Sequence, residues 1–159
     1  MSITVDYRLF SYKIVVMSKV GVGIITCDRP DMYNICIESI DKSWYDELVV
    51  VDDGKKDHPN HNRDGIYIQT TGGEGVGKAK NAALKHLMGE DCDYIILIED
   101  DMKFTGNLFK EYIDAYEQTG IHHFMFAYHG PANKAGVSYG KPVPRKVVDY
   151  GDIKIALNQ

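Results

Sequence analysis

The sequence predicts an α/β domain in which a mostly parallel central sheet is flanked by helices. Short runs of almost entirely apolar residues favour strands buried on both faces, which is the habit of parallel sheets. Between these runs lie segments whose apolar residues recur at helical spacing, as expected for crossover helices. The apolar runs are 20–26, 48–51 and 94–98, and the helical segments are 32–43, 76–88 and 106–118.

Further segments complete an expected order of β-α-β-β-α-β-α-β with a short C-terminal part. They are a strand at 66–69, a glycine-rich stretch at 70–77, a strand at 122–128, a long loop at 130–144 and two short strands within 147–157. Residues 1–19 are expected to form an N-terminal arm or an extra edge strand. Residues 20–159 are expected to form the domain.

Length and composition exclude several classes of protein. The 159 residues suffice for one domain with a buried core, and a net charge of −5 gives no sign of nucleic-acid binding. No apolar run approaches the roughly 20 residues needed to span a bilayer, and the N-terminus lacks a signal-peptide pattern, so a cytoplasmic protein is expected. Cys27, Cys36 and Cys92 have no CxxC spacing and are expected to be reduced thiols.

Acidic residues directly follow two of the predicted buried strands. Glu99, Asp100 and Asp101 follow one strand, and Asp52 and Asp53 follow another. Because the carboxyl ends of parallel strands share an edge, these side chains are expected on one rim. Packed carboxylates repel one another unless a positive group separates them, and oxygen ligands suit hard divalent cations. In an extended chain Glu99 and Asp101 would point to one side and Asp100 to the other.

The glycine-rich stretch allows two interpretations. Gly72 to Lys78 matches the G-x-x-x-x-G-K pattern of a phosphate-binding loop, which would indicate an NTPase. Ala79, however, stands where that loop needs a hydroxyl to bind magnesium. The other interpretation is a helix start whose backbone N–H groups, with Lys78 and Lys80 nearby, hold a diphosphate.

Four short motifs occur in order along the chain. They are VGIITCDRP at 22–30, VVVDDG at 49–54, GKAKNAA at 77–83 and IEDD at 98–101. They resemble, in turn, the T-x-N/D-R turn, the V-D-D-G-S motif, the A-R-N-x-G helix start and the D-x-D motif of family 2 glycosyltransferases. The chain is therefore similar to this family, and the resemblance implies the GT-A fold, with a Rossmann-like central sheet.

The resemblance also implies roles for individual residues. Asp52 would hydrogen-bond the nucleotide base, Asp100 would reach the ribose or sugar, and Asp101 would bind Mn²⁺ or Mg²⁺ at the diphosphate. Glu99, at the first D-x-D position, and His129, after the strand expected at 122–128, are further metal candidates. The nucleotide-sugar-binding candidates are Thr26, Cys27, Arg29, Asp52, Asp53, Gly77, Lys78, Lys80 and Asp100.

The function implied is metal-dependent transfer of a hexose from a nucleotide diphosphate sugar, with a UDP-sugar favoured, to a hydroxyl of a glycan or other acceptor. An inverting transferase needs a carboxylate base near the acceptor hydroxyl. Asp149 and Asp152 are the candidates, although the acceptor-binding half is expected to be short for the family. The alternatives are a non-catalytic module that binds sugar nucleotides and an NTPase of the phosphate-loop type.

Overall fold

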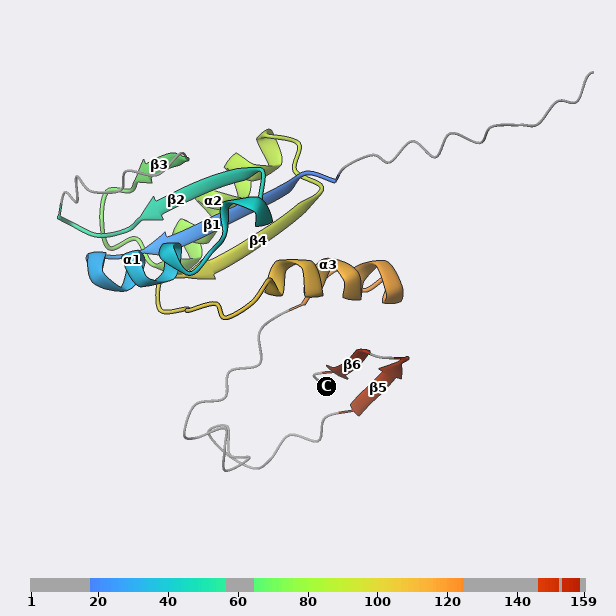
Figure 1. Ribbon diagram of the computed structural model, residues 1–159. Helices are drawn as coiled ribbons and strands as arrows, with labels where there is room; N and C mark the ends of the chain where they lie inside the picture. The colour runs from blue at the N-terminus through green and yellow to red at the C-terminus, as the bar shows by residue number, and fades with distance from the viewer. Residues whose placement is uncertain (1–17, 57–64, 125–145, 152, 158–159) are drawn as a thin grey trace, which may run out of the picture.

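The computed structural model describes residues 18–56, 65–124, 146–151 and 153–157, so residues 1–17 of the predicted arm and the loop at 130–144 lie outside the described residues. Four strands form a fully parallel sheet in the order β3-β2-β1-β4 (Figure 1). This sheet confirms the predicted α/β class. The strands are β1 (Val20–Thr26), β2 (Glu47–Asp52), β3 (Ile66–Gln69) and β4 (Tyr94–Glu99).

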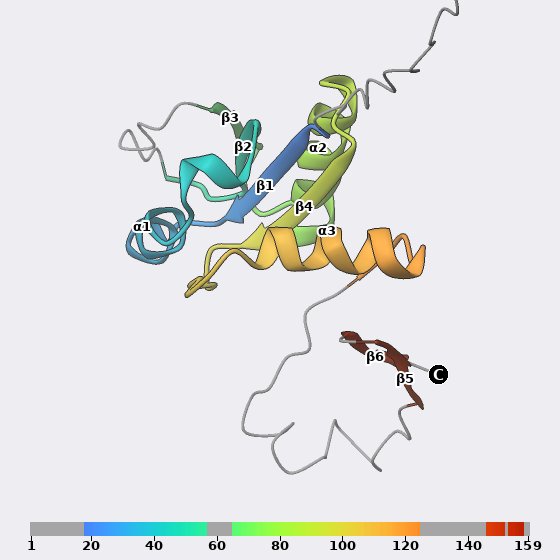
Figure 2. The ribbon, with the colours of Figure 1, turned by 45° about the vertical axis from the view of Figure 1, so that its right-hand side comes forward.

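Helices cover both faces of the sheet. Figures 1 and 2 show α2 (Val76–Gly89) behind the sheet and α1 (Pro30–Glu38) on the other side, with α3 (Leu108–Thr119) running beside β4. Two separate apolar clusters correspond to these two layers. In β2, Leu48 and Val50 pack in the cluster of α1 and α3, while Val49 and Val51 pack in the cluster of α2. This alternation explains why the strand reads as uninterruptedly apolar.

Small residues let α2 lie close to β1. A Cβ added to Gly23 would come within 2.9 Å of the Ala83 Cβ and 2.8 Å of Leu97 Cδ2. Ala79 and Ala83 are fully buried at this contact. Because the helix is held this closely, its N-terminus is fixed beside the carboxyl ends of the strands.

The helix predicted at 32–43 is wrong in its bounds. α1 ends at Glu38, where the Ser39 hydroxyl donates to the Cys36 carbonyl at 2.6 Å. A separate 3-10 turn, η1 (Lys42–Trp44), follows, and Asp41 caps it by accepting from the Ser43 N–H. Ile35, one of the apolar residues at helical spacing in this segment, is 54% exposed, and the buried residues of α1 are Tyr33, Cys36 and Ile37.

The strand predicted at 122–128 is not formed in its described part. Residues 121–124 follow α3 without strand structure, and 125–128 lie outside the described residues. The Phe124 ring stacks on Tyr112, and the His122 ring contacts Tyr116, so side chains of α3 hold this segment. Two short strands do occur near the C-terminus as predicted, β5 (Lys146–Tyr150) and β6 (Ile153–Leu157), which form an antiparallel pair. No helix in the described parts of the chain is long and apolar enough to cross a membrane.

Candidate functional site

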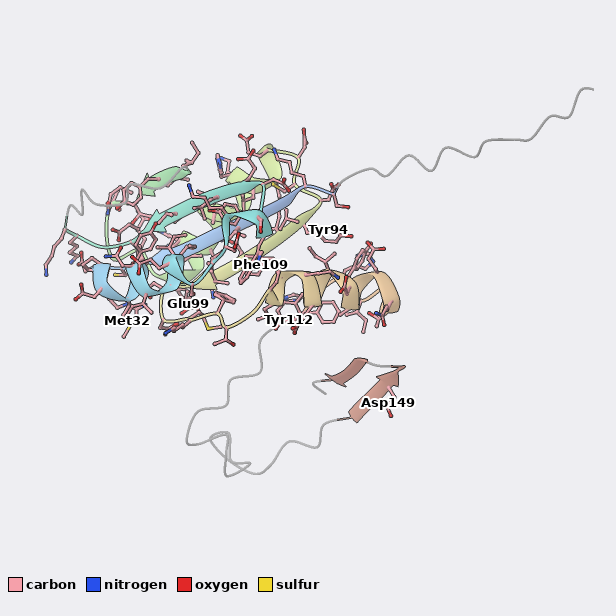
Figure 3. The ribbon with its side chains drawn as sticks, viewed as in Figure 1. Met32, Tyr94, Glu99, Phe109, Tyr112 and Asp149 are labelled. Carbon is pink, nitrogen blue, oxygen red and sulfur yellow. The ribbon has the colours of Figure 1, made fainter. Side chains whose placement is uncertain are left out.

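The carboxyl ends of β1, β2 and β4 meet at one edge of the sheet. Thr26 pairs with Asp52 in the parallel register, and Ile25 pairs with Glu99. The ladder continues one residue further, because Asp53 N–H donates to the Thr26 carbonyl and Asp100 N–H donates to the Ile25 carbonyl. The two acidic segments are therefore brought together, as parallel strand order requires. In Figure 3, Tyr94 and Glu99 mark the two ends of β4.

A pocket of about 200 Å³ opens at this edge. Complete ligand pockets are usually about 300–1,000 Å³, so this one has room for only part of a ligand of that size. It lies where the strand order reverses. From β1 the chain goes outward to β2 and β3 and then returns to place β4 on the other side of β1, and ligands of α/β proteins bind at such a point. Its lining residues are Ile25, Thr26, Cys27, Arg29, Asp53, Gly75, Val76 and Glu99.

Asp100 is buried and paired with groups of the turn after β1. The Arg29 guanidinium forms an ion pair with it, with Nε 3.2 Å from Oδ2, and the Thr26 hydroxyl donates to the same oxygen at 2.7 Å. Burial raises the pKa of Asp100 above its ordinary value, whereas the Thr26 hydrogen bond and the Arg29 charge lower it. The Asp100 side chain is fully buried, so losing the partly exposed Arg29 would leave this carboxylate with a single hydroxyl partner.

Glu99 and Asp101 lie in more open surroundings than Asp100. Lys80 Nζ of α2 is 2.6 Å from Glu99 Oε1, and both side chains are partly exposed. Asp101 is exposed. Glu99 therefore points to the α2 side of the sheet and Asp100 to the α1 side, which is the alternation expected of an extended strand.

Asp53 organises the glycine-rich stretch. Its carboxylate accepts hydrogen bonds from Thr70 Oγ1 at 2.5 Å, from Glu74 N–H at 3.0 Å and from Gly75 N–H at 2.7 Å. The hydrogen bond from Thr70 holds the pKa of Asp53 below its ordinary value, against the opposing effect of burial, and the Gly75 and Glu74 N–H groups lower it further. Two backbone N–H groups of the loop thus bind a carboxylate of the protein itself, that of Asp53.

This arrangement argues against the phosphate-loop interpretation. In such a loop the backbone N–H groups surround the phosphates of the nucleotide. Here the carboxylate of Asp53 takes that place, and the loop follows β3, which lies at the end of the sheet order. The loop therefore serves to position the start of α2.

The start of α2 has open space around it. Gly75 is the N-cap residue, no side chain caps the helix, and its first turn contains no acidic residue. A Cβ added to Gly75 or Gly77 would meet no atom within 4 Å. Backbone N–H groups at a helix start favour anions, and Gly75 and Val76 line the pocket. Lys78, which the sequence placed in this site, lies 3.4 Å from Glu74 as an exposed ion pair.

Asp52, like Asp100, is buried. Its Oδ1 accepts from Gly54 N–H at 2.7 Å, and Tyr67 Oη lies 2.8 Å from Oδ2. Asp52 is not among the residues that line the pocket. A base could reach this carboxylate only if Tyr67, which is 37% exposed, turned away.

Sequence reasoning missed the contact between the turns after β1 and β2. Asp28 accepts from the N–H groups of Lys55 and Lys56, and its φ of 52° is unusual for a residue other than glycine. A Cβ on Gly54 would lie 2.7 Å from the Asp28 backbone nitrogen, so only glycine fits there. The D-R and D-G turns were visible in the sequence, but their mutual contact was not.

The other predicted site residues are only partly described. Cys27 is exposed and lines the pocket. Asp149 is exposed on β5, opposite Lys154 of β6. His129 and Asp152 lie outside the described residues, so their metal and base roles stay predictions.

The carboxylates at this edge suit a hard cation whose other ligands come from a bound molecule. Among the described residues, no group of three His, Cys, Asp or Glu side chains forms a ready metal cage. Mg²⁺ and similar ions are commonly held by one or two carboxylates together with substrate phosphates and water. Asp101 is exposed and Glu99 is partly exposed, so either carboxylate could supply an oxygen ligand of this kind.

The sequence of this chain matches a known protein family. The sequence model described as glycosyl transferase family 2 matches residues 22–136. That match spans the four motifs, the pocket and all of the parallel sheet except the first two residues of β1. No curated protein and no solved structure matched the chain. Because the family match covers most of the sequence, the chain belongs to glycosyl transferase family 2 and is a glycosyltransferase.

Proposed function

We propose that this glycosyltransferase takes its sugar from a nucleotide diphosphate sugar, with a UDP-sugar as the favoured donor, in the presence of Mn²⁺ or Mg²⁺. The observation that carries the proposal is the pocket at the carboxyl edge of β1, β2 and β4. Its lining combines the Arg29 guanidinium with the open N-terminus of α2, and both favour an anionic ligand.

The diphosphate of the donor is proposed to lie between Arg29 and the start of α2. The Gly77 N–H, the backbone of Val76 and the ammonium groups of Lys78 and Lys80 are the nearby groups that favour its negative charge. A divalent cation held by Asp101, with Glu99 and His129 as further candidate ligands, would neutralise charge on the departing diphosphate.

The nucleoside is proposed to occupy the side of the pocket formed by Thr26, Cys27 and Asp53. The proposal also has Asp52 accept a hydrogen bond from the nucleotide base. This requires Tyr67 to give up its own hydrogen bond to that carboxylate. Asp100, which is paired with Arg29 and Thr26, would act toward the donor chiefly by orienting the guanidinium.

Transfer is proposed to invert the configuration at the anomeric carbon of the sugar. The acceptor oxygen forms a bond to this carbon while the bond from the carbon to the phosphate oxygen breaks. The electron pair of the broken bond leaves with the nucleoside diphosphate, and the acceptor proton passes to a carboxylate base. Asp149 and Asp152 are the proposed bases, and the acceptor is a hydroxyl of a glycan or another molecule.

A ligand panel tests this proposal directly. UDP with Mn²⁺ is expected to raise the melting temperature of the full chain more than ATP or GDP does, and EDTA should remove most of the effect. Asp101→Ala should abolish the Mn²⁺-dependent part, while Asp114→Ala, which removes an exposed carboxylate on α3, should not. A set of UDP-sugars then identifies the sugar through release of UDP. Stronger binding of ATP than of UDP, or equal binding by the Asp101→Ala protein, would contradict the proposal.

A further inference from the structure

The ion pair between Lys80 and Glu99 joins α2 to the end of β4 at the pocket. Nζ of Lys80 is 2.6 Å from Oε1 of Glu99, and Glu99 is one of the residues that line the pocket. The two side chains are 37% and 43% exposed. Lys80 lies just over one turn into α2, so its flexible side chain begins near the open helix start.

The neighbouring pair of Arg29 and Asp100 differs in burial. The Asp100 side chain has no exposure, and Thr26 adds a hydrogen bond to it. Breaking that pair would leave a buried carboxylate with only a hydroxyl partner, which is strongly unfavourable. An exposed ion pair contributes little to stability, because water solvates both groups once they separate. Of the two pairs, the one between Lys80 and Glu99 is therefore the one that can exchange its partners.

We propose that Lys80 exchanges Glu99 for the diphosphate of the donor, and that this exchange frees Glu99 to join Asp101 in holding the divalent cation. The inference rests on the proposed donor and deepens it. Without a donor, the ammonium of Lys80 neutralises Glu99 and repels a second cation, so Asp101 is the main carboxylate that the cation meets. Because a diphosphate carries more negative charge than one carboxylate, it attracts the ammonium of Lys80 more strongly than Glu99 does.

Donor and cation consequently bind with positive cooperativity. Each ligand strengthens the other by the same factor, because coupling between two binding sites is reciprocal. The coupling has two parts. One is the direct attraction of cation and diphosphate, and the other is the release of Glu99 by Lys80. Only the second part depends on this ion pair, so changes to Lys80 and Glu99 isolate it.

The first test replaces the cation of the pair in the full chain. Lys80→Met should increase the affinity of the nucleotide-free protein for Mn²⁺ about threefold to tenfold, because Glu99 is no longer neutralised. Free Mn²⁺ is measured by electron paramagnetic resonance. The same variant should lower the affinity for UDP in EDTA, measured by calorimetry. Lys110→Met is the matched control, since it removes the same charge from another exposed Lys–carboxylate pair, and it should change neither affinity.

The second test replaces the anion of the pair. Glu99→Gln releases Lys80 and removes a negative charge beside the diphosphate, so metal-free binding of UDP should become tighter. A purely structural role for the pair would change neither ligand's affinity and would lower only the melting temperature. Opposite effects of Lys80→Met on Mn²⁺ and UDP, together with tighter metal-free UDP binding by Glu99→Gln, are the expected result.

The outcomes separate this inference from the proposed function. If the unchanged protein binds UDP with Mn²⁺ but Lys80→Met leaves the Mn²⁺ affinity of the nucleotide-free protein unaltered, the exchange is refuted and the donor proposal stands. If the unchanged protein binds no UDP under any condition, both are refuted.

Discussion

Arg29 Nε lies 3.2 Å from Oδ2 of the buried Asp100, and through this contact the turn after β1 is joined to the end of β4. Thr26 donates to the same carboxylate oxygen from the last position of β1. The second acid of the D-x-D-like segment is therefore part of the framework of the site. The first acid, Glu99, and the third, Asp101, face more open surroundings.

Removing the guanidinium should destabilise the protein. Arg29→Ala leaves a buried carboxylate with a single hydroxyl partner, and because Arg29 is itself partly exposed we expect a loss of about 1–3 kcal/mol in the free energy of unfolding. Asp100→Asn should cost less than this, since it removes the buried charge, and the double variant should be no less stable than Arg29→Ala. Urea denaturation measures the three values. Lys103→Ala, which removes an exposed positive charge nearby, is the control, and an equal loss for it would contradict the prediction.

Close packing of α2 on β1 should make Gly23 intolerant of a methyl group. In Gly23→Ala the new Cβ would meet Leu97 Cδ2 at 2.8 Å and Ala83 Cβ at 2.9 Å, which predicts a loss of about 1–3 kcal/mol in stability. Gly89→Ala is the matched control. Its Cβ meets nothing within 4 Å at the end of α2, so the same change should stabilise the helix by up to about 1 kcal/mol. Thermal and urea denaturation of both proteins test the contrast, and equal destabilisation would disprove it.

Asp53 should make the stability of the protein sensitive to acid. Its pKa is lowered from the ordinary 3.8, first by the hydrogen bond from Thr70. A lowered folded-state pKa means that the ionised group stabilises the fold above 3.8, and that this contribution is lost as the pH falls through the lower folded value. A carboxyl-carbon NMR titration should place the midpoint of Asp53 below 3.8.

Thr70→Val should move this midpoint upward, because it removes the largest cause of the shift. Thr71→Val is the control. Thr71 bonds Glu74 and not Asp53, so its loss should leave the Asp53 midpoint in place. A midpoint that moves equally in both variants would mean that general loosening of the loop, and not the Thr70 hydroxyl, determines the pKa.

Cysteine modification should report on the pocket. Cys27 is exposed at the pocket, whereas burial raises the pKa of the Cys36 thiol to about 12. At pH 8, iodoacetamide is therefore expected to modify Cys27 and to leave Cys36 intact in the folded protein. Partial burial and the nearby Asp28 charge also raise the pKa of Cys27, so its rate should climb as the pH rises above 8.

A bound donor should protect Cys27 alone. UDP with Mn²⁺ is expected to slow modification of Cys27, while Cys92, which precedes β4 at the opposite end of that strand, should react at an unchanged rate. Peptide mass spectrometry measures the three thiols in one sample. Equal protection of Cys27 and Cys92 would indicate a general change in the protein and would argue against a donor in the pocket.

Local patterns in the sequence were sufficient to predict most of the sheet and its chemistry. The strand at 48–51 is buried on both faces, and the strand at 94–98 packs against apolar clusters on both faces although it is only partly buried, so both could be recognised without knowing their neighbours. Parallel order then placed Asp52 and Asp100 at one edge. The helix at 32–43 was misjudged because its end depends on the Ser39 hydroxyl and the cap at Asp41, which compete with helix continuation.

The sequence by itself determined that the acidic segments after β2 and β4 meet at the carboxyl edge, since the strand ends follow from the pattern of apolar residues and the α/β pattern implies parallel strands. Only the tertiary structure decided how each acid is used, because a carboxylate's role depends on its partners and its exposure. Asp53 accepts hydrogen bonds from the glycine-rich loop, the buried Asp100 forms an ion pair with Arg29, and the partly exposed Glu99 forms an ion pair with Lys80. These partners lie 17 to 71 residues apart in the chain, so no local pattern could reveal the contacts.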